Sequence, residues 1–425
     1  MRLCHQTKLV ALIAMVVAII AVPLLSACAG GQPAPAAEKK VKLGYIAFST
    51  GPVGDCGLPA TQAGADYVRW INEHGGIDGV KIDFMWIDSG YEVPRSIAAY
   101  QRLKQWGANV IWSFGSTPND AIRALATEDG MPIVAWGGPA ELFFPASKNV
   151  FFSTYESYDR EGRAGLLWLM KNLKDLPPKP KVGMIHPDDA YGWSFANGPR
   201  YYFDVDGYEL VPDQLAPHGA LDVTTQVRHF IDAKVDIISF TYTAGTAAVV
   251  MRDARRLGFK GPLMGTHYSM IDYALGKLSE GAAEGAYFNT HTYLLTDKRP
   301  GSEEINDMIK AYHPGTDIYK PADGIICWLH GPIAVKTAVE GIRAAIKNVG
   351  YENLNKKAIW QGLESLKNMN AFGLQTVSFA PDDHTGSMGF GMLQYQKGDF
   401  KLVGDFVPAP AIADWEKEGK FKWTK

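Results

Sequence analysis

An excess of charge of either sign is absent from this sequence. Lys and Arg number 42 against 45 Asp and Glu, which gives a formal net charge of -3 over 425 residues. A chain this close to neutral has no strong field with which to hold nucleic acid or an anionic membrane surface. We therefore expect a small solute or another protein as the partner, and no nucleic acid.

Motifs for catalysis and cofactor binding are also missing. The chain has no G-x-S-x-G elbow, Walker loop, C-x-x-C pair, H-E-x-x-H helix or G-x-G-x-x-G turn after a strand. Its closest structured histidine pair, His218 and His229, is too widely spaced to bind a metal from one helical face. These absences predict no enzyme, no cofactor and no local metal site, and leave open a metal held by residues distant in sequence.

Cysteine is scarce, and the second of the four cysteines stands in an informative place. A basic start with Arg2 and Lys8 precedes an uncharged run from Leu9 to Leu25, which ends in the sequence LSAC at Cys28. This pattern is typical of a bacterial lipoprotein signal, in which residues 1–27 are removed and Cys28 is lipidated. The alternative is a plain membrane-spanning anchor.

The segment that follows the signal is small, polar and rich in proline, so we interpret residues 28–40 as a flexible tether. The protein is then exported and lipid-anchored in the periplasm or on the cell surface.

The rest of the chain is too long for one hydrophobic core and alternates β-rich runs with amphipathic stretches. We expect strands at 41–48, 81–88, 109–114, 132–136, 181–186, 208–211, 235–240 and 262–266. Helices are expected at 58–76, 94–107, 163–172, 191–204, 223–233 and 246–257. This order predicts an α/β protein with two doubly wound, parallel-sheet lobes joined by a hinge.

Beyond residue 286 we expect one more strand-like run, followed by helices near 301–313, 324–347 and 354–365. Helices without a sheet of their own must cover an existing sheet, so the chain should return to the first lobe. We place the first lobe at 41–155 plus 290–375, and the second at 156–289 plus 376–425.

The junction FGSTPNDA (114–121) has the features of a helix start at a strand end. Thr117 suits the N-cap and Pro118 the first helical position, so free N–H groups should face the crevice of a doubly wound fold. The next strand is followed by a loop in which Gly137 and Gly138 permit close backbone approach. An ordinary capped helix and a turn without a ligand are the alternatives.

Several longer segments resemble the leucine/isoleucine/valine-binding class of type I periplasmic binding proteins, over residues 41 to about 407. They are TGPVGDCGLPATQAGADYVRWINEHGGIDG, VIWSFGSTPNDAIRALATEDGMPIV, PDDAYGWS and DARRLGFKGPLMGT. The resemblance implies a monomeric receptor of an ABC importer that closes two lobes on a small solute and is recognised by a membrane permease. A ligand sensor of the same fold, coupled to a signalling protein, is the alternative.

The resemblance also assigns residues. The family's carboxylate-binding serine falls on Ser116 and its second-lobe tyrosine on Tyr191, but Pro139 replaces a threonine and His267 replaces the glutamate that binds the ammonium group. The sequence offers no acceptor near His267, so a standard α-amino acid fits poorly. An aromatic or apolar carboxylate, or an amide, fits better.

The resemblance further places Thr117, Gly137 and Gly138 at the polar end of the solute, Thr243 and His267 on the second lobe, and Cys56 and Trp328 in the wall. It brings Cys56 and Cys327 near the pocket, where a disulfide and two separate thiols both remain open. An exported hydrolase using Ser116 or Cys56 as a nucleophile is a further alternative, although no base stands at a fixed spacing.

Overall fold

The protein, seen here in a computed structural model, is described at residues 38–270, 275–315, 325–411 and 413–421. The chain from Lys40 onward forms one compact unit. The predicted signal, Cys28 and nearly all of the tether lie outside the described residues. Within the described ranges no helix has both the length and the apolar character needed to cross a bilayer.

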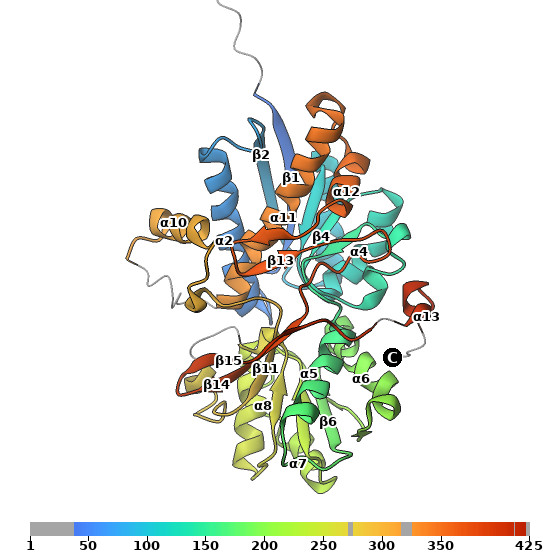
Figure 1. Ribbon diagram of the computed structural model, residues 1–425, viewed down its shortest axis with the longest axis vertical. Helices are drawn as coiled ribbons and strands as arrows, with labels where there is room; N and C mark the ends of the chain where they lie inside the picture. Colours follow the sequence, from blue (N-terminus) through green and yellow to red (C-terminus); the bar gives the residue numbers. More distant parts are fainter. Residues whose placement is uncertain (1–37, 271–274, 316–324, 412, 422–425) are drawn as a thin grey trace, which may run out of the picture. The chain divides into compact units, whose positions relative to one another are not determined.

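A five-stranded parallel sheet forms the first half of this unit (Figure 1). Its order is β2-β1-β3-β4-β5, with β1 at Lys40–Ala47, β2 at Lys81–Asp88, β3 at Val110–Ser113, β4 at Ile133–Ala135 and β5 at Phe151–Ser153. The strands β3, β4 and β5 are buried along their whole length. Short apolar runs of this kind form strands that are covered on both faces.

Helices from two distant parts of the sequence cover the first sheet. They are α2 (Gly54–Glu73), α3 (Val93–Trp106), α4 (Ser116–Glu128), α11 (Ile325–Val349) and α12 (Lys356–Glu364), with 3-10 turns η2 (Ala140–Leu142), η3 (Ala146–Lys148) and η6 (Tyr351–Asn353). The helix α11 packs along α2. A Cβ atom on Gly331 would lie 2.3 Å from the Ala60 carbonyl oxygen, so glycine is required for these two helices to come so close.

A second sheet forms the other half, in the order β15-β14-β11-β10-β9-β6-β7, with β8 also paired to β6. Its strands are β6 (Lys181–His186), β7 (Glu209–Leu210), β8 (Gln214–Leu215), β9 (Ile237–Phe240), β10 (Leu263–Gly265), β11 (Tyr287–Thr290), β14 (Phe390–Gln396) and β15 (Asp399–Val407). The strands from β6 to β11 run parallel, and β14 and β15 are antiparallel additions at one edge.

The second half also has its own helices: α5 (Tyr158–Asn172), α6 (Ala190–Asp206), α7 (Thr224–Asp232), α8 (Ala244–Arg256), the 3-10 turn η4 (His267–Met270) and α9 (Leu275–Leu278). The remaining elements are η5 (Leu295–Asp297), α10 (Glu303–Tyr312), the hairpin β12 (Met369–Ala371) with β13 (Gln375–Val377), and α13 (Asp414–Lys417).

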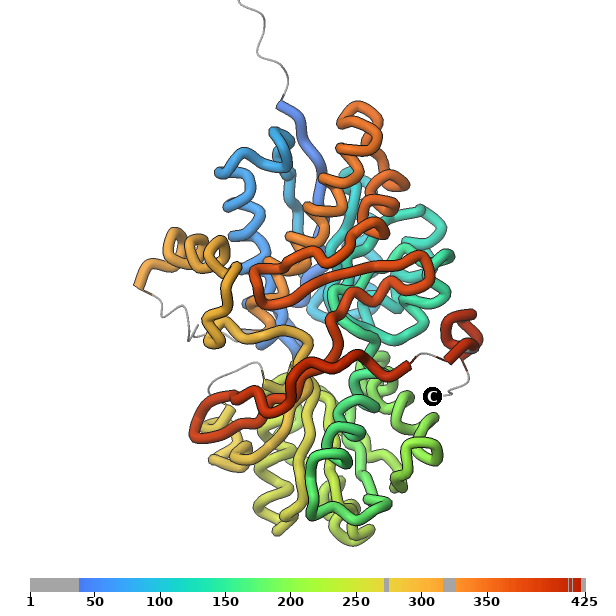
Figure 2. The backbone as a smooth tube through the Cα atoms, viewed as in Figure 1, coloured from blue at the N-terminus to red at the C-terminus, as the bar shows by residue number. Residues whose placement is uncertain are grey.

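Three segments connect the two halves, between β5 and α5, between β11 and α10, and between β13 and β14 (Figure 2). The two doubly wound parallel sheets expected from the sequence are therefore present, and the chain does return to the first sheet after β11. The late strands β12 to β15 were not predicted. They form hairpins, and the turn Lys397-Gly398 with positive φ at both residues joins β14 to β15.

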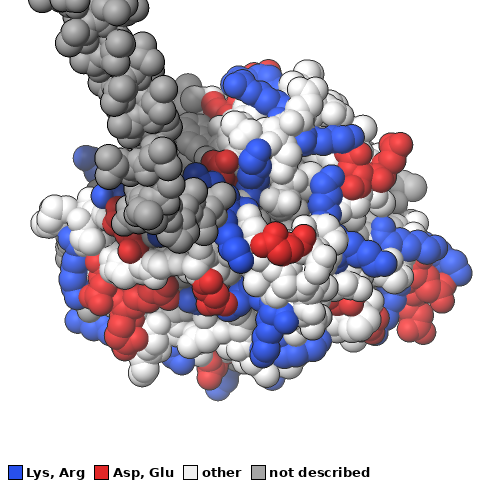
Figure 3. Space-filling view, turned by 90° about the horizontal axis from the view of Figure 1, so that it is seen from above, with Lys and Arg blue, Asp and Glu red and all other residues white. Residues whose placement is uncertain are grey.

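Acidic and basic side chains are mixed on the surface. The face shown in Figure 3 carries Lys and Arg interspersed with Asp and Glu, with no broad region of one sign among the residues that are drawn in colour. This distribution agrees with the near-zero net charge.

Candidate ligand-binding site

A small cavity of about 30 Å³ lies where several strands of the two sheets end. It is lined by Phe48, Val53, Cys56, Tyr91, Phe114, Gly115, Ser116, Tyr158, Tyr191, Thr243 and Tyr268. Phe48 and Phe114 follow the carboxyl ends of β1 and β3, while Thr243 and Tyr268 follow those of β9 and β10. Doubly wound folds bind ligands at the carboxyl ends of their strands. In this protein the carboxyl ends of strands from both sheets face the same space. None of these lining residues is charged.

The start of α4 supplies a polar group to this cavity. The N-cap is Gly115, with φ of +99°, and the helix begins at Ser116. The prediction that Thr117 is the N-cap is therefore wrong. Glycine tolerates this φ, and a Cβ at position 115 would lie 2.7 Å from the Tyr91 ring, so only glycine fits here. Because Gly115 can turn the chain at this point, the helix starts earlier than the Thr-Pro pair suggested.

This earlier start changes the role of Ser116. Its hydroxyl is buried, lines the cavity and has no hydrogen-bond partner within the described part of the protein. It also lies in the first turn of a 13-residue helix, where backbone N–H groups lack intrahelical acceptors and the helix dipole is positive. The site can therefore donate hydrogen bonds to a carboxylate or carbonyl oxygen.

A disulfide forms part of the cavity wall. Cys56 on α2 is bonded to Cys327 on α11, with their Cα atoms 5.2 Å apart. The bond joins the two helices that pack across the first sheet, and it leaves Cys56 without a free thiol for nucleophilic chemistry.

Tyrosines and a threonine supply the other side. The hydroxyl groups of Tyr191 and Thr266 are 2.9 Å apart. Thr243 is the N-cap of α8, and its hydroxyl and the N–H of Gly245 face the carboxylate of Asp55 on α2. Burial raises the pKa of Asp55, and these two donors partly oppose that rise. This contact links the helix after β1 to the helix after β9.

A second pair of tyrosines closes the cavity. The hydroxyls of Tyr158 and Tyr268 are 2.6 Å apart, and they lie 3.0 and 3.2 Å from the carbonyl oxygen of Trp136, so one hydroxyl donates to the other and that second hydroxyl donates to the carbonyl. The loop after β4 is therefore tied to α5 and η4. This chain of hydrogen bonds holds both rings in fixed orientations beside the cavity.

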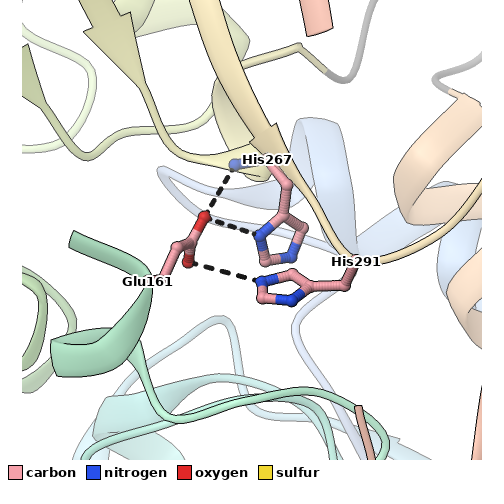
Figure 4. Close-up of side chains that lie close together, drawn as sticks. All are labelled: Glu161, His267 and His291. Atoms are coloured by element: carbon pink, nitrogen blue, oxygen red, sulfur yellow. Dashed lines mark hydrogen bonds and ion pairs between the residues drawn. The ribbon is translucent and has the colours of Figure 1, made fainter. Parts of the chain in front are cut away.

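His267 lies at the start of η4, and Figure 4 shows a carboxylate beside it. Oε1 of Glu161, on α5, is 3.0 Å from the backbone nitrogen of His267 and 3.0 Å from its Nδ1. The expectation that no acceptor lies near His267 is therefore wrong. The two residues are 106 positions apart, so the sequence around His267 gave no sign of the pair.

Burial and the neighbouring histidines shift the pKa of Glu161 in opposite directions. Burial alone would raise the pKa of Glu161, but His267 and His291 lower it below its usual value. The pKa of His291 falls to about 4, mainly because of burial, and burial also lowers the pKa of His330. Glu161 is therefore an ionised carboxylate surrounded by imidazoles.

Other predicted residues lie outside the cavity lining. The N–H of Gly137 donates to Ser153 Oγ at 2.9 Å, and the carbonyl oxygen of Gly138 accepts from Tyr158 N–H at 3.0 Å. A Cβ on Gly137 would lie 2.3 Å from the Tyr158 ring, so the glycine allows that ring to approach. Thr117 and Trp328 also fall outside the lining, Trp328 being buried in the core on α11.

The model of the periplasmic binding protein family matches residues 40–399 of this sequence. The chain belongs to the periplasmic binding protein family. Within it, the relatives and the fold place the protein in the leucine/isoleucine/valine-binding class of type I proteins. This periplasmic binding protein is accordingly a solute-binding protein and not an enzyme. Membership implies export to the periplasm, a small-molecule ligand and the permease of an ABC transporter as partner.

Curated relatives agree with this assignment at low identity. The chain is 23% identical over 411 residues to Leu/Ile/Val-binding protein homolog 7 of Brucella melitensis biotype 1, covering 93% of this chain and 98% of the relative. It is 19% identical over 277 residues to the Leu/Ile/Val-binding protein of Escherichia coli strain K12, covering 65% of this chain and 74% of the relative.

Solved structures share the fold. A branched-chain amino acid ABC transporter protein from Thermus thermophilus with bound valine has a TM-score of 0.78 at 24% identity, covering 88% of this chain and 97% of that one. A fatty acid ABC transporter substrate-binding protein from Thermomonospora curvata has a TM-score of 0.77 at 21% identity, covering 89% and 94%. Proteins described with different ligands therefore share this architecture.

Sequence reasoning missed most of the aromatic wall. Phe48, Tyr91, Phe114, Tyr158 and Tyr268 line the cavity but were not among the predicted site residues. Phe48, Phe114 and Tyr268 stand within three residues of the end of a predicted strand, and that position is the signal that could have identified them.

Proposed function

We propose that this periplasmic binding protein is the lipid-anchored receptor of an ABC importer for an apolar or aromatic solute that carries a carboxylate or an amide. A standard α-amino acid is not its ligand in this proposal. The observation that carries the proposal is the cavity lining, which among the described residues is rich in aromatic rings and contains no charged residue. The cavity of about 30 Å³ is far smaller than a ligand pocket of about 300–1,000 Å³, so the two lobes have to move apart to admit the solute. Aromatic walls with a few polar groups are typical of sites for apolar small molecules.

The polar end of the solute is assigned to the start of α4. The Ser116 hydroxyl has no partner within the described residues, and the adjacent first-turn N–H groups favour negative charge. An amide or a carboxylate oxygen suits these donors. Thr117 follows Ser116 in the chain, and Gly137 and Gly138 follow the next strand, β4. Tyr191 and Thr243 line the cavity from the second half.

No carboxylate among the described residues lines the cavity to receive an ammonium group. Pro139 has neither a hydroxyl nor an N–H, and the Glu161 carboxylate is paired with His267 outside the lining. Neither Glu161 nor His267 lines the cavity. A desolvated ammonium without an acceptor or counter-charge is strongly disfavoured, which favours deaminated analogues over amino acids.

The mechanism is closure of two lobes around the solute, with the lobes at 41–155 plus 290–375 and 156–289 plus 376–425. The polar contact of Thr243 and Gly245 with Asp55 lies between these two parts and would favour the closed form, which a monomer presents to the permease. Cys56 then shapes the space as part of the cavity wall, while His267 and Trp328 support that wall from outside the lining.

The test is a thermal-shift screen with matched ligands that differ only in the ammonium group. Leucine is compared with 4-methylpentanoate and 4-methylpentanamide, and phenylalanine with 3-phenylpropanoate and 3-phenylpropanamide. At 100 times its dissociation constant, a ligand adds about 2.7 kcal/mol of stability, which a melting curve resolves. The proposal expects a shift only with deaminated compounds; strong stabilisation by leucine or valine would refute it.

A ligand identified in this screen can then be used to distinguish a receptor for import from a sensor. In proteoliposomes with the permease, the loaded receptor should stimulate ATP hydrolysis. A loaded receptor that leaves ATP hydrolysis unchanged would favour the sensor.

A further inference from the structure

A cluster of potential metal ligands lies outside the cavity lining. Glu161 comes from α5, His267 begins η4, and His291 follows the end of β11 (Figure 4). One ligand atom from each residue can be chosen so that all three atoms lie within 4.8 Å of one another. All three side chains are buried. From this geometry we infer that Glu161, His267 and His291 form a binding site for a divalent first-row transition metal ion, of which Zn²⁺ is the model.

Internal hydrogen bonds leave several of these atoms without partners. Oε2 of Glu161 and both ring nitrogens of His291 have no hydrogen-bond partner within the described residues. His291 Nε2 lies 3.8 Å from Glu161 Oε2, which is beyond hydrogen-bond distance. Buried polar atoms of native proteins nearly always have a partner, so this group lacks one that the described part of the chain does not supply.

The donor set selects the class of ion. Two imidazoles and one carboxylate suit Zn²⁺ and its first-row neighbours, whereas Ca²⁺ and Mg²⁺ prefer sites made of oxygen ligands. The set consists of Glu161 Oε2, His267 Nδ1 and His291 Nε2. His267 Nδ1 donates to the carboxylate in the metal-free form, so metal binding at Nδ1 replaces this hydrogen bond and the ring proton moves to Nε2.

The spacing suits an ion after small shifts. Bonds of about 2.0–2.1 Å in a tetrahedron place neighbouring ligand atoms about 3.3 Å apart. The carboxylate contacts, 3.0 Å from Oε1 to His267 Nδ1 and 3.8 Å from Oε2 to His291 Nε2, lie on either side of that value, so either oxygen can serve as the ligand. Each of these two separations differs from the tetrahedral spacing by less than 1 Å.

An ion in this position would join three segments of the second half. α5 follows one connection between the halves, and His291 begins another, so the metal would fix the segments from which the connections leave. Because the ion binds outside the solute cavity, this inference does not depend on the proposed solute class.

The experiment is a titration of tag-free, chelator-treated full-length protein with CoCl₂ and ZnCl₂, followed by visible absorption and calorimetry. We expect one ion per chain, a tetrahedral cobalt spectrum and a higher melting temperature. His291→Asn and Glu161→Gln should each weaken binding at least about tenfold. The matched control is His313→Asn, because His313 is also paired with a carboxylate, Asp66, at 2.8 Å but outside the cluster.

Circular dichroism of the metal-free proteins shows which of the cluster variants, His291→Asn and Glu161→Gln, is folded. One folded cluster variant is sufficient to test the loss of metal affinity. No cobalt spectrum in the wild-type protein, or equal loss of affinity in the control and the cluster variants, would overturn the inference. Failure of the solute screen would leave these readouts unchanged, so the two proposals fail separately.

Discussion

The disulfide between Cys56 and Cys327 makes the strongest prediction about stability. It closes a loop between residues that are 271 positions apart in the sequence. For a loop of that length, the chain-entropy model gives a loss of unfolded-state entropy equivalent to about 5–6 kcal/mol. Measured effects of disulfides are usually about 2–5 kcal/mol, so reduction should remove a large part of the free energy of unfolding.

The assay is urea unfolding of a chain spanning residues 38–425, in which Cys56 and Cys327 are the only cysteines. Wild-type protein is compared with and without reductant, and Cys56→Ala/Cys327→Ala serves as a second comparison that does not depend on reduction. The midpoint should fall in both cases, and thiol titration of the unreduced, unfolded protein should find no free thiol. Two free thiols, or an unchanged midpoint after complete reduction, would refute the reasoning.

Three further predictions concern other parts of the chain. Gly57→Ala should cost about 1–3 kcal/mol of unfolding free energy, because its Cβ would lie 1.9 Å from the Phe48 carbonyl oxygen; Gly245→Ala, with 3.8 Å to its nearest atom, is the control, and equal melting temperatures would contradict this. Burial lowers the pKa of His384 to about 4, so its neutral form contributes stability above its unfolded pKa of about 6.5. About 3 kcal/mol should be lost as pH falls from 6.5 to 4, and His384→Asn should flatten that dependence in urea unfolding; parallel curves would count against it. Cys28→Ser should abolish lipid labelling, and unchanged labelling would show that the lipoprotein interpretation is wrong.

Local patterns explain which parts of the fold could be predicted. The buried strand β6 and the amphipathic helix α8 follow the apolar periodicity of their own residues, so their positions were close to those expected. β14 and β15 were missed because residues 376–425 were assigned to the second lobe without any expected strand or helix. Their antiparallel pairing adds to an edge of the second sheet, which depends on where the chain returns in space.

The site depended still more on tertiary structure. Ser116 and Tyr191 were found because they stand in recognisable motifs next to strands, and both line the cavity. Glu161 was missed because it lies in the first turn of α5, before the helix that was expected at 163–172, and a glutamate there usually faces solvent. Only the packing of α5 against η4 brings its carboxylate to His267.

The central claim is that a solute without an ammonium group is held between the two sheets by groups from both sides. Calorimetry of 3-phenylpropanoate, or of the best ligand from the screen, with wild-type protein, Ser116→Ala and Thr243→Val tests it most directly. Loss of a hydrogen bond of about 0.5–1.5 kcal/mol should weaken binding about 2- to 13-fold in each variant. Unchanged affinity in both variants, or tighter binding of phenylalanine than of its deaminated analogue, would contradict the account.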